Sequence, residues 1–482
     1  MRTEAFIDGR FVPAADGRTF ATISPRDGSQ IAQVARGGAE DVDRAVGAAR
    51  RAYEHGDWAY ADPAQRGRVL VRMGELMTQH LDELARLEAI DTGHPIGDAR
   101  GVDVPNAARC FAWYGEAIDK VYGEIAPTAA DALALIAREP LGVVGAVVPW
   151  NYPLIITAWK LAPALAAGNS VVLKPAEQSP LSALALAELA AEAGVPDGVL
   201  NVVPGYGEEA GQALGRHDDV DKVAFTGSVV VGRCFQRYAG ESNGKAVSLE
   251  LGGKSPQVVL ADAADLQSAA EAIGWGIFYN AGQTCHAGSR VVVARPVRDE
   301  LVERLQRFAT ETFVPADPMQ PDTILGALIS TEHLDGVMAR VQRAADSGVR
   351  VLTGGTRAQP VPGGAYMQPT LIEAEDRHDP IVTEEVFGPV LVIQTADDVD
   401  HALELANDTR YGLAAALWTS DVRTAGRLAR RLRAGTVWVN TFDASSMATP
   451  FGGFRDSGHG RDRSLHALDA YTQLKTTWIS LT

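Results

Sequence analysis

The chain has 482 residues, of which 46% are hydrophobic and 22% charged, and its formal net charge at neutral pH is −17. This length exceeds the roughly 250–300 residues at which one hydrophobic core stops growing, so we expect two or more domains. The acidic balance argues against a nucleic acid or an anionic membrane as partner, because both require a basic protein surface.

Cysteine usage and the N-terminal composition bear on the compartment and on metal binding. The three cysteines are too few and too scattered for a disulfide framework or a zinc site. Residues 1–10 carry charges and lack the apolar stretch of a signal peptide. We therefore expect a cytoplasmic protein without a structural metal.

The first third of the chain changes pattern twice. Residues 5–35 alternate short β-type runs with Asp-Gly turn signals, which predicts antiparallel strands. Residues 41–118 have apolar side chains at helical spacing, and residues 122–139 have the composition of extended chain. We expect a strand region, then helices, then an extended segment.

Residues 141–173 are almost wholly apolar, with Lys160 as the only charge. Length alone would permit a membrane span, but Pro149, Pro153, Pro163 and Gly168 divide the segment into strand-sized and helix-sized pieces. We expect a buried strand–helix–strand unit. The alternation continues, with strands predicted at 143–148, 170–173, 199–203, 222–225 and 246–249 and helices at 154–167, 181–193, 208–214 and 229–239. Such alternation predicts a parallel, doubly wound sheet.

A second α/β region follows. It has predicted helices at 265–279, 297–308 and 423–432, and predicted strands at 290–294, 390–394, 437–439 and 474–481. The fold class is therefore α/β, with two doubly wound, Rossmann-like domains and an extended β-strand arm built from segments distant in sequence.

Cys285 is the one cysteine in a polar, glycine-containing loop, since Cys110 and Cys234 fall within helical patterns typical of buried, inert thiols. A thiolate flanked by backbone N–H groups is a good nucleophile. From this segment alone, a nucleophile and a buried small side chain are equally good interpretations.

Two further side chains end predicted strands. Glu250 follows the strand at 246–249 and precedes Gly252 and Gly253. The carboxyl ends of parallel strands form ligand clefts, and apolar surroundings raise a glutamate's pKa toward that of a general base. A surface glutamate that starts a turn is the alternative. Asn151 precedes a helix starting near Pro153, where it either caps the helix or donates to an oxyanion.

Signals for phosphate binding are weaker, because no Gly-x-Gly-x-x-Gly motif follows a strand. The strand at 222–225 leads into Gly227 and Ser228 and then a helix, whose N-terminus would suit a pyrophosphate. Gly207 and Gly211 permit a similar close approach, although ordinary strand–helix turns look the same. Beyond the strand at 170–173, Lys174 and Glu177 suit the hydroxyls of an adenosine ribose.

Together these motifs resemble the aldehyde dehydrogenase superfamily, over about residues 6–480. The matching segments are 149–153, 174–180, 225–228, 250–256, 282–285, 384–389 and 450–461. The resemblance implies Cys285 as the nucleophile, Glu250 as the general base and Asn151 as an oxyanion donor. It also implies NAD as cofactor, held by Trp150, Lys174, Glu177, Gly207, Gly211, Gly227, Ser228, Glu385 and Phe387. Of these, Glu385 corresponds to a ligand of the nicotinamide ribose, and Phe387 to a residue beside the nicotinamide.

The resemblance further implies a division of the chain and an assembly. Residues 1–121 and 141–251 would bind the cofactor, and residues 252–468 would form the catalytic domain. Residues 122–140 and 469–482 would form an arm that pairs subunits into a homodimer or homotetramer. The partner in the reaction would be a small aldehyde, oxidised to its carboxylic acid through a thioester.

Residues 113–124 and 458–480 resemble the γ-glutamyl-γ-aminobutyraldehyde and 3-hydroxypropionaldehyde dehydrogenase type. By this resemblance the substrate tunnel would be lined by Asp103, Asn106, Trp113, Tyr152, Trp159, Thr284, His286, Asp443 and Phe451. Aromatic walls, with Asp103 and Asp443 nearer the mouth, favour an ω-amino or other ω-polar aldehyde. The alternative is that both aspartates are solvated rim residues. His286 and the Ala444-Ser445-Ser446 sequence depart from the family's pattern, which leaves the exact substrate open.

Three alternatives remain at this stage: a CoA-acylating aldehyde dehydrogenase, a general aliphatic aldehyde dehydrogenase, and a binding protein that kept the fold. Glu250 weighs against acylation of CoA, because transfer to CoA needs no base to activate water. Keeping Cys285, Glu250, Asn151 and Lys174 together weighs against a protein without catalytic function.

Overall fold

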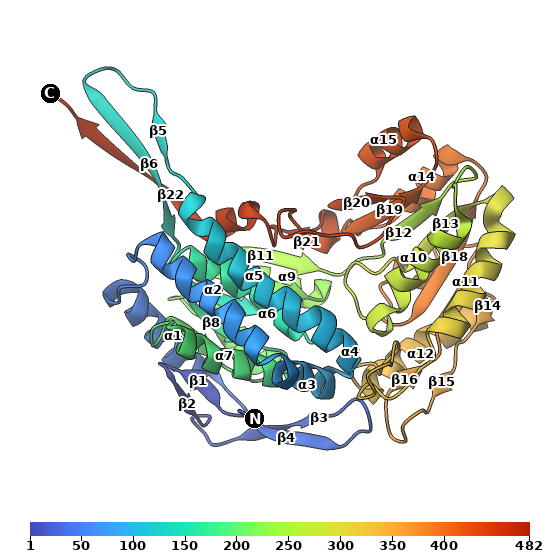
Figure 1. Cartoon of the computed structure of the whole chain (residues 1–482), viewed down its shortest axis with the longest axis horizontal. Coiled ribbons are helices and arrows are strands. Elements are labelled where there is room, and N and C mark those ends of the chain that lie inside the picture. Colours follow the sequence, from blue (N-terminus) through green and yellow to red (C-terminus); the bar gives the residue numbers. More distant parts are fainter.

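A computed structural model describes all residues from 1 to 482. Two α/β units lie side by side, and a narrow β-strand arm extends from the first unit, with the C-terminus at its tip (Figure 1). None of the helices combines the length and the apolar character that crossing a membrane requires. The apolar segment after residue 141 forms a strand, a helix and a second strand, as predicted.

The first unit is built on an eight-stranded sheet in the order β2-β1-β9-β8-β7-β10-β11-β21. Its strands are β1 (Ala5–Ile7), β2 (Arg10–Val12), β7 (Val143–Val147), β8 (Ser170–Lys174), β9 (Leu200–Val202), β10 (Lys222–Gly227), β11 (Ala246–Leu251) and β21 (Gly458–His459). Strands β7 to β11 are parallel, whereas β1, β2 and β21 add antiparallel edges. Strands β8 and β9 lie on one side of β7 and β10 lies on the other, so the carboxyl ends of β7 and β10 flank the crevice where ligands bind in such sheets.

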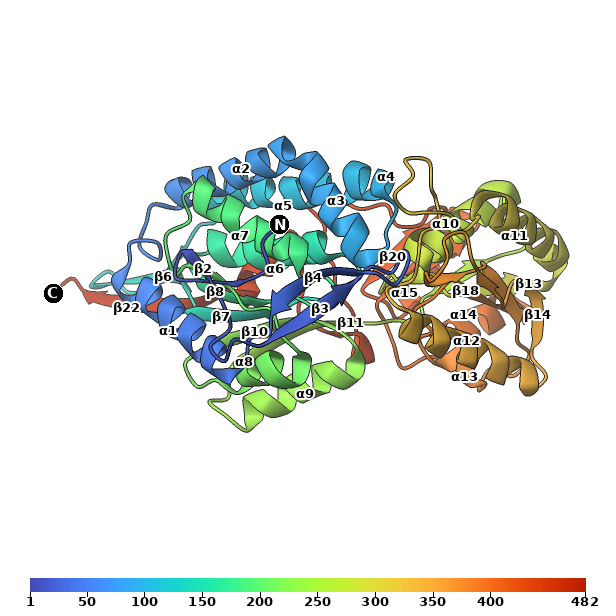
Figure 2. The ribbon, with the colours of Figure 1, turned by 90° about the horizontal axis from the view of Figure 1, so that it is seen from below.

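Helices cover both faces of this sheet, as Figure 2 shows for α2, α5 and α7 above it and α8 and α9 below it. The helices are α1 (Ala39–His55), α2 (Pro63–Gln79), α3 (Leu81–Thr92), α4 (Ile96–Asp98), α5 (Val104–Ala117), α6 (Pro153–Ala166), α7 (Leu181–Ala193), α8 (Gln212–Arg216) and α9 (Val229–Gly240). A cluster of buried side chains fills each interface between helices and sheet, so the strands are apolar on both faces.

The second unit is built on a seven-stranded sheet in the order β14-β17-β18-β13-β12-β19-β20, with only β14 antiparallel. Its strands are β12 (Pro256–Val259), β13 (Arg290–Ala294), β14 (Arg350–Thr353), β17 (Thr370–Glu373), β18 (Val390–Ala396), β19 (Ala414–Trp418) and β20 (Thr436–Val439). Its helices are α10 (Leu266–Phe278), α11 (Arg298–Thr312), α12 (Thr331–Asp346), α13 (Pro380–Thr383), α14 (Val399–Asn407) and α15 (Val422–Arg431). The α/β fold class with two doubly wound units is confirmed.

The arm is a three-stranded sheet in the order β22-β6-β5. Strand β22 (Thr472–Ser480) pairs antiparallel with β6 (Ala132–Pro140), which pairs with β5 (Glu124–Ala126). The predicted boundary at residue 468 does not coincide with the sheets, because β21 pairs with β11 and Ala467, Leu468 and Tyr471 are buried in the first core. The chain thus returns to the first unit before it enters the arm.

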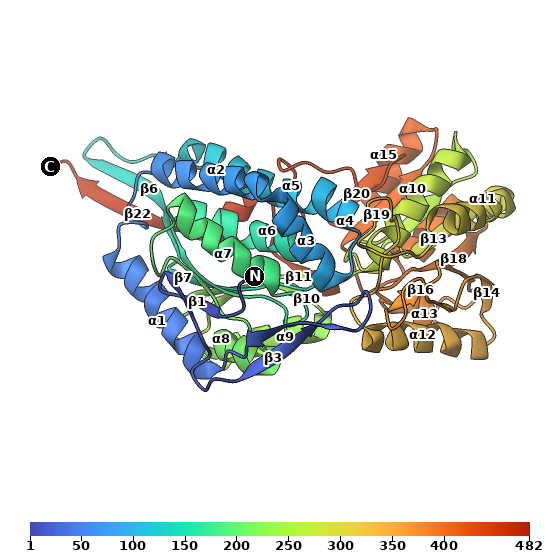
Figure 3. The same ribbon diagram turned by 60° about the horizontal axis from the view of Figure 1, so that its bottom comes forward.

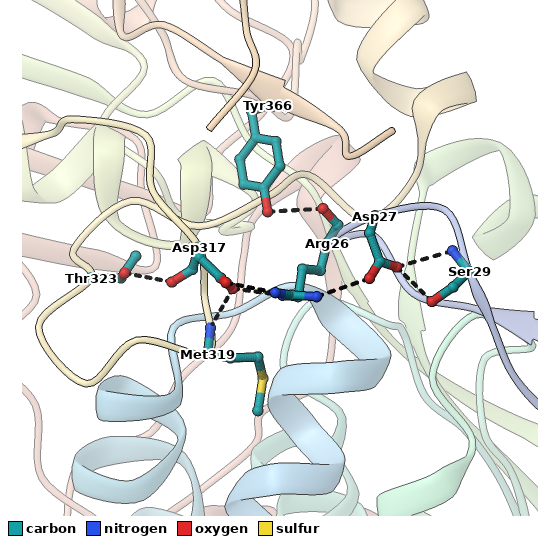
Figure 4. Close-up of polar contacts among 7 residues, drawn as sticks. All are labelled: Arg26, Asp27, Ser29, Asp317, Met319, Thr323 and Tyr366. Carbon is teal, nitrogen blue, oxygen red and sulfur yellow. Dashed lines mark hydrogen bonds and ion pairs between the residues drawn. The ribbon is translucent and has the colours of Figure 1, made fainter. Parts of the chain in front are cut away.

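A hairpin of β3 (Thr19–Ile23) and β4 (Gln30–Ala35) runs from the first unit to the second (Figure 3). At its tip, both nitrogens Nε and Nη2 of Arg26 donate to the carboxylate of Asp317, each at 2.7 Å (Figure 4). The Tyr366 hydroxyl, from the short pair β15 (Arg357–Ala358) and β16 (Tyr366–Met367), donates to the Arg26 carbonyl at 3.0 Å. This bidentate ion pair is a specific polar link between the two units.

We predict that Asp317→Asn lowers the apparent melting temperature by about 2–4 °C, because a partly exposed bidentate pair is worth roughly 1 kcal/mol. Scanning calorimetry measures this change. The control is Asp322→Asn, which changes an exposed aspartate of the same loop that makes no side-chain hydrogen bond or ion pair. Equal melting temperatures for the two variants would show that the link between Arg26 and Asp317 contributes nothing.

Candidate active site

The loop that carries Cys285 has an unusual backbone. Asn280, Ala281 and Gly282 follow one another with φ of 48°, 52° and 72°. The left-handed region costs roughly 1–2 kcal/mol for a residue with a Cβ, so the surroundings must hold this turn in place. A Cβ on Gly282 would lie 2.1 Å from the Gly388 carbonyl oxygen, which makes glycine obligatory there. The loop is therefore a fixed platform for the thiol.

Asn151 anchors this platform to the first unit. Its Nδ2 donates to the Gln283 carbonyl at 2.8 Å, and Asn280 Nδ2 donates to the Asn151 carbonyl at 2.9 Å. Helix α6 begins at Pro153 without a side-chain cap, so the capping interpretation of Asn151 is wrong. An amide nitrogen has two N–H groups, and only one is used within the protein. The other is free to stabilise a developing negative charge.

Glu250 lies near the end of β11 and is 5% exposed, so it is not a surface residue that starts a turn. Neither carboxylate oxygen has a hydrogen-bond partner. Burial raises the pKa of Glu250 well above its usual value, the charge of Asp462 raises it further, and Lys160 opposes them. Lys160 and Asp462 form a buried ion pair of 2.5 Å. The Glu250 carboxyl group is thus a strong potential base without a competing partner.

Cys285 faces a pocket of about 380 Å³ between the two units. Six of the predicted substrate residues line it: Asn106, Tyr152, Trp159, His286, Asp443 and Phe451. The sequence analysis missed other lining residues, among them Arg109, Tyr279, Trp438, Met447 and Arg463. Arg463 lies within the resembling segment 458–480, which was the available signal.

Three predicted tunnel residues lie elsewhere. Asp103 was expected near the mouth of the tunnel but is fully buried. Its carboxylate is paired there with His94 Nδ1 at 2.7 Å. Trp113 packs edge-on against the Tyr114 ring at 4.9 Å and does not line the pocket. Thr284 is buried behind the wall, where its Oγ1 hydrogen-bonds the Tyr152 hydroxyl at 2.8 Å. Of the two expected acids, only Asp443 reaches the pocket.

His286 connects Cys285 to Asp443. Its Nδ1 lies 3.8 Å from the thiol sulfur, and its Nε2 lies 2.9 Å from Oδ1 of Asp443. The rings of Trp438 and Phe451 pack around the imidazole, with centroids 5.9 and 5.5 Å away. Burial alone would lower the pKa of His286, but the charge and hydrogen bond of Asp443, together with Cys285, raise it to about 10. At neutral pH a protonated imidazole therefore faces the sulfur, and a cation beside a thiol makes it more reactive.

The predicted cofactor residues gather around the crevice of the first sheet. Lys174, at the end of β8, binds Glu177 at 2.8 Å. Ser228 caps α9 by accepting from the Val231 N–H, so the other N–H groups of the first turn remain available to an anion. Gly227 is required because a Cβ would lie 2.5 Å from the Phe225 ring.

Space and chemistry at this crevice fit a dinucleotide. No protein atom lies within 4 Å of the Cβ position at Gly207, whereas that of Gly211 is in contact with the Phe235 ring of α9. The crevice thus offers an open glycine surface, a carboxylate for ribose hydroxyls and a helix N-terminus for phosphate.

Glu385 and Phe387 approach the same crevice from the second unit. The Gly253 N–H donates to Oε1 of Glu385 at 3.2 Å, and burial raises the pKa of Glu385 to about 7. The rings of Phe387 and Trp150 pack edge to face at 5.3 Å. No group of three or more His, Cys, Asp or Glu side chains is arranged to hold a metal ion.

Comparison with known proteins agrees with this geometry. The model of the aldehyde dehydrogenase family matches residues 11–477. NADP/NAD-dependent aldehyde dehydrogenase PuuC of Escherichia coli (strain K12) is 50% identical over 481 residues, covering 100% of this chain and 96% of that protein.

Two solved structures are also similar. The γ-glutamyl-γ-aminobutyraldehyde dehydrogenase of Burkholderia cenocepacia J2315 has a TM-score of 0.98 and 52% identity, covering 100% of this chain and 97% of that one. An indole-3-acetaldehyde dehydrogenase in complex with NAD+ has a TM-score of 0.98 and 49% identity, covering 99% and 97%.

The contact between His286 and Cys285 predicts a pH effect on thiol reactivity. Because the pKa of His286 is raised to about 10, the imidazolium is present below that pH and makes the thiol more reactive. Replacing His286 by Asn should lower the rate of alkylation by iodoacetamide throughout the neutral part of the pH profile, by about tenfold at pH 7, the equivalent of 1.4 kcal/mol. Mass spectrometry of the Cys285 peptide measures this alkylation.

The other charged groups near this pair are Glu250, which faces the thiol, and Arg463, whose charge acts on Asp443. Asp443→Asn should lower the alkylation rate in the same way as His286→Asn, by a smaller amount. An unchanged alkylation profile in both variants would exclude a role of His286 in the reactivity of Cys285.

Proposed function

The chain belongs to the aldehyde dehydrogenase family, and on that premise we propose that it oxidises an aldehyde to the carboxylic acid with NAD+, through a thioester on Cys285. One observation carries the proposal: Asn151, with one amide N–H free, binds the loop that presents the Cys285 thiol to the pocket, and the unpartnered, buried Glu250 carboxyl group lies close enough to Cys285 for the two charges to interact.

The first step is addition of the Cys285 thiolate to the aldehyde carbon, which forms a C–S bond and an oxyanion. The His286 imidazolium holds the thiolate before attack. The free N–H of Asn151, with the backbone N–H of Cys285, stabilises the oxyanion. Because both donors are fixed in a loop and a turn that bind each other, little reorganisation accompanies the reaction.

Bound in the crevice, NAD+ would supply the hydride acceptor that lets the carbon attached to Cys285 lose its hydride as the oxyanion collapses to a thioester. Lys174 and Glu177 would hold the adenosine ribose, and Trp150, Gly207, Gly211, Gly227 and Ser228 the adjoining phosphate crevice. Glu385 and Phe387 would position the nicotinamide end. A 2′-phosphate would meet the Glu177 carboxylate and be repelled, so NAD+ should be preferred to NADP+.

Glu250 would then remove a proton from water, which attacks the thioester carbon and releases the acid and the Cys285 thiolate. Its raised pKa makes Glu250 a better base, and its lack of a hydrogen-bond partner leaves both oxygens free to accept from a water molecule that enters the site. The buried pair of Lys160 and Asp462 lies close enough to modulate its charge.

We assign residues 1–121 and 141–251 to cofactor binding and the second unit, within 252–468, to catalysis. The arm of residues 122–140 and 469–482 would join subunits into a homodimer or homotetramer. Strand β22 is an edge strand whose Leu474 and Trp478 are 62% and 66% exposed, as expected of a surface that a second subunit covers. The three cysteines are unpaired, which is consistent with a reducing, cytoplasmic compartment.

The substrate would be an aldehyde with a polar far end, and among ω-amino aldehydes this includes those that also carry a carboxylate, such as the γ-glutamyl-γ-aminobutyraldehyde named for a similar structure. A general aliphatic aldehyde dehydrogenase would need no polar group in this pocket, yet Asn106, Arg109 and Arg463 line it. A CoA-acylating enzyme would need no base, yet Glu250 is buried and unpartnered.

We predict that Cys285→Ala abolishes NADH formation, to below about a thousandth of wild type, and leaves NAD+ binding nearly intact, because covalent catalysis requires its nucleophile. Initial rates and calorimetric titration with NAD+ measure the two properties. The matched control is Cys234→Ala on α9, which should keep full activity. Substantial turnover by Cys285→Ala would contradict the assignment.

Glu250→Gln should stall the enzyme after NADH release, because the thioester then lacks its base. Stopped-flow absorbance should record a burst of NADH close to the enzyme concentration, followed by turnover slower by about 10²–10⁴-fold. Intact mass spectrometry should detect the acyl-enzyme. Loss of the burst itself would instead place Glu250 in an earlier step, such as removal of the Cys285 proton.

A further inference from the structure

Arg463 is a buried guanidinium without a partner in the wall of the Cys285 pocket. The residue is 8% exposed and makes no hydrogen bond or ion pair, and its Nε is a buried, unsatisfied donor. Buried charges in proteins are nearly always paired, because an unpaired one loses its hydration without compensation. A bound anion would supply the missing partner.

The structure holds this side chain in place. The guanidinium carbon lies 5.2 Å from the centre of the Trp159 ring and 5.3 Å from that of Phe451, and both rings line the pocket. Its backbone has a φ of 60°, and the next residue, Ser464, has a φ of 52°. Ser464 is fixed by donating its N–H to the Met447 carbonyl and by accepting from the Tyr114 hydroxyl, each at 2.9 Å. Arg463 is thus positioned at the cost of backbone strain.

A second free cation lines the same pocket. Arg109 on α5 is exposed and makes no ion pair or hydrogen bond. The only acid in the lining, Asp443, binds His286 at 2.9 Å, and Asp462 beside Arg463 binds Lys160 at 2.5 Å. Neither acid forms an ion pair with Arg463 or Arg109. The pocket therefore presents two cations that no carboxylate of the protein contacts.

We propose that this pocket selects aldehydes whose far end carries a carboxylate, which Arg463 binds at the wall while Arg109 attracts it at the mouth. The inference rests on the proposed function, since it specifies the substrate of the same site. A guanidinium offers parallel N–H groups that match the two oxygens of a carboxylate. A far end that is only an ammonium would face the two cations, whereas a zwitterionic end still offers its carboxylate.

The test compares adipic semialdehyde with its methyl ester, which has the same chain without the charge. Hexanal and trimethylammoniobutanal serve as the neutral and cationic references. In the wild type, kcat/KM for NADH formation should be at least about tenfold higher with adipic semialdehyde than with the ester. In Arg463→Gln this ratio should fall to near one, and Arg463→Lys should restore part of it. Arg109→Gln should lower the ratio less, because an exposed charge is screened by water.

Arg86→Gln is the matched control for Arg109→Gln, since Arg86 on α3 is also exposed and unpaired but lies outside the pocket lining. In this variant the ratio of kcat/KM between semialdehyde and ester should stay unchanged. The inference would be overturned if the wild-type kcat/KM for the ester, for hexanal or for trimethylammoniobutanal equalled that for adipic semialdehyde. The proposed function would then remain intact. The same holds if the ratio persists in Arg463→Gln. Absence of NADH with every aldehyde would instead refute the proposed function.

A further measurement needs no variant, should Arg463→Gln fail to fold. Hexanoate should slow alkylation of wild-type Cys285 by iodoacetamide at concentrations at which hexanamide, its neutral analogue, has little effect. Equal protection by the two compounds would contradict a carboxylate site in the pocket.

Discussion

The site depends on one reciprocal contact between the two units. Asn151, in the turn between β7 and α6, donates to the Gln283 carbonyl and accepts from the Asn280 side chain. The loop of residues 280–282 has a left-handed backbone that it would not adopt alone. A hydrogen bond from the Ile329 N–H to Oε1 of Gln283 also holds this loop in place. The reciprocal contact brings Asn151, the proposed oxyanion donor of the first unit, beside the loop that carries Cys285, the proposed nucleophile of the second. The site exists only when both units are folded and docked.

The proposed chemistry depends on two buried polar groups, Glu250 and Arg463, that lack hydrogen-bond or ion-pair partners within the protein. Glu250 has no hydrogen-bond partner and Arg463 has no ion pair, although the protein interior penalises both conditions. Their neighbours that serve structure, such as Lys160 with Asp462 and Asp103 with His94, are paired. We propose that Glu250 and Arg463 interact with water and substrate, whereas the paired groups maintain the fold. It also moves the expected site of substrate recognition from the two aspartates to the two arginines.

The sequence predicted well the elements whose residue pattern is self-sufficient. Helix α7 and strand β13 have the predicted bounds, because an alanine–leucine run and a valine run between polar turns leave little choice. Strands β12 and β19 were not predicted, since such short runs acquire strand character only from their neighbours. Helices α12 and α14 were missed although their buried residues recur at helical spacing, which was a usable signal. Local motifs singled out Cys285, Glu250 and Asn151 as candidates. The burial of Asp103, by contrast, involves its contact with His94, and the position of Arg463 depends on the Trp159 ring, which is distant in sequence. No local pattern contains that information.

Product analysis is the decisive test of hydrolytic, NAD-dependent oxidation of an aldehyde at Cys285. An aldehyde would be incubated with NAD+ in the presence and absence of CoA, and NADH, free acid and acyl-CoA would be quantified together. If Glu250 activates water to hydrolyse the thioester, NADH and carboxylic acid should form in equal amounts, with no change on adding CoA. Accumulation of acyl-CoA, or acid formed without NADH, would contradict it.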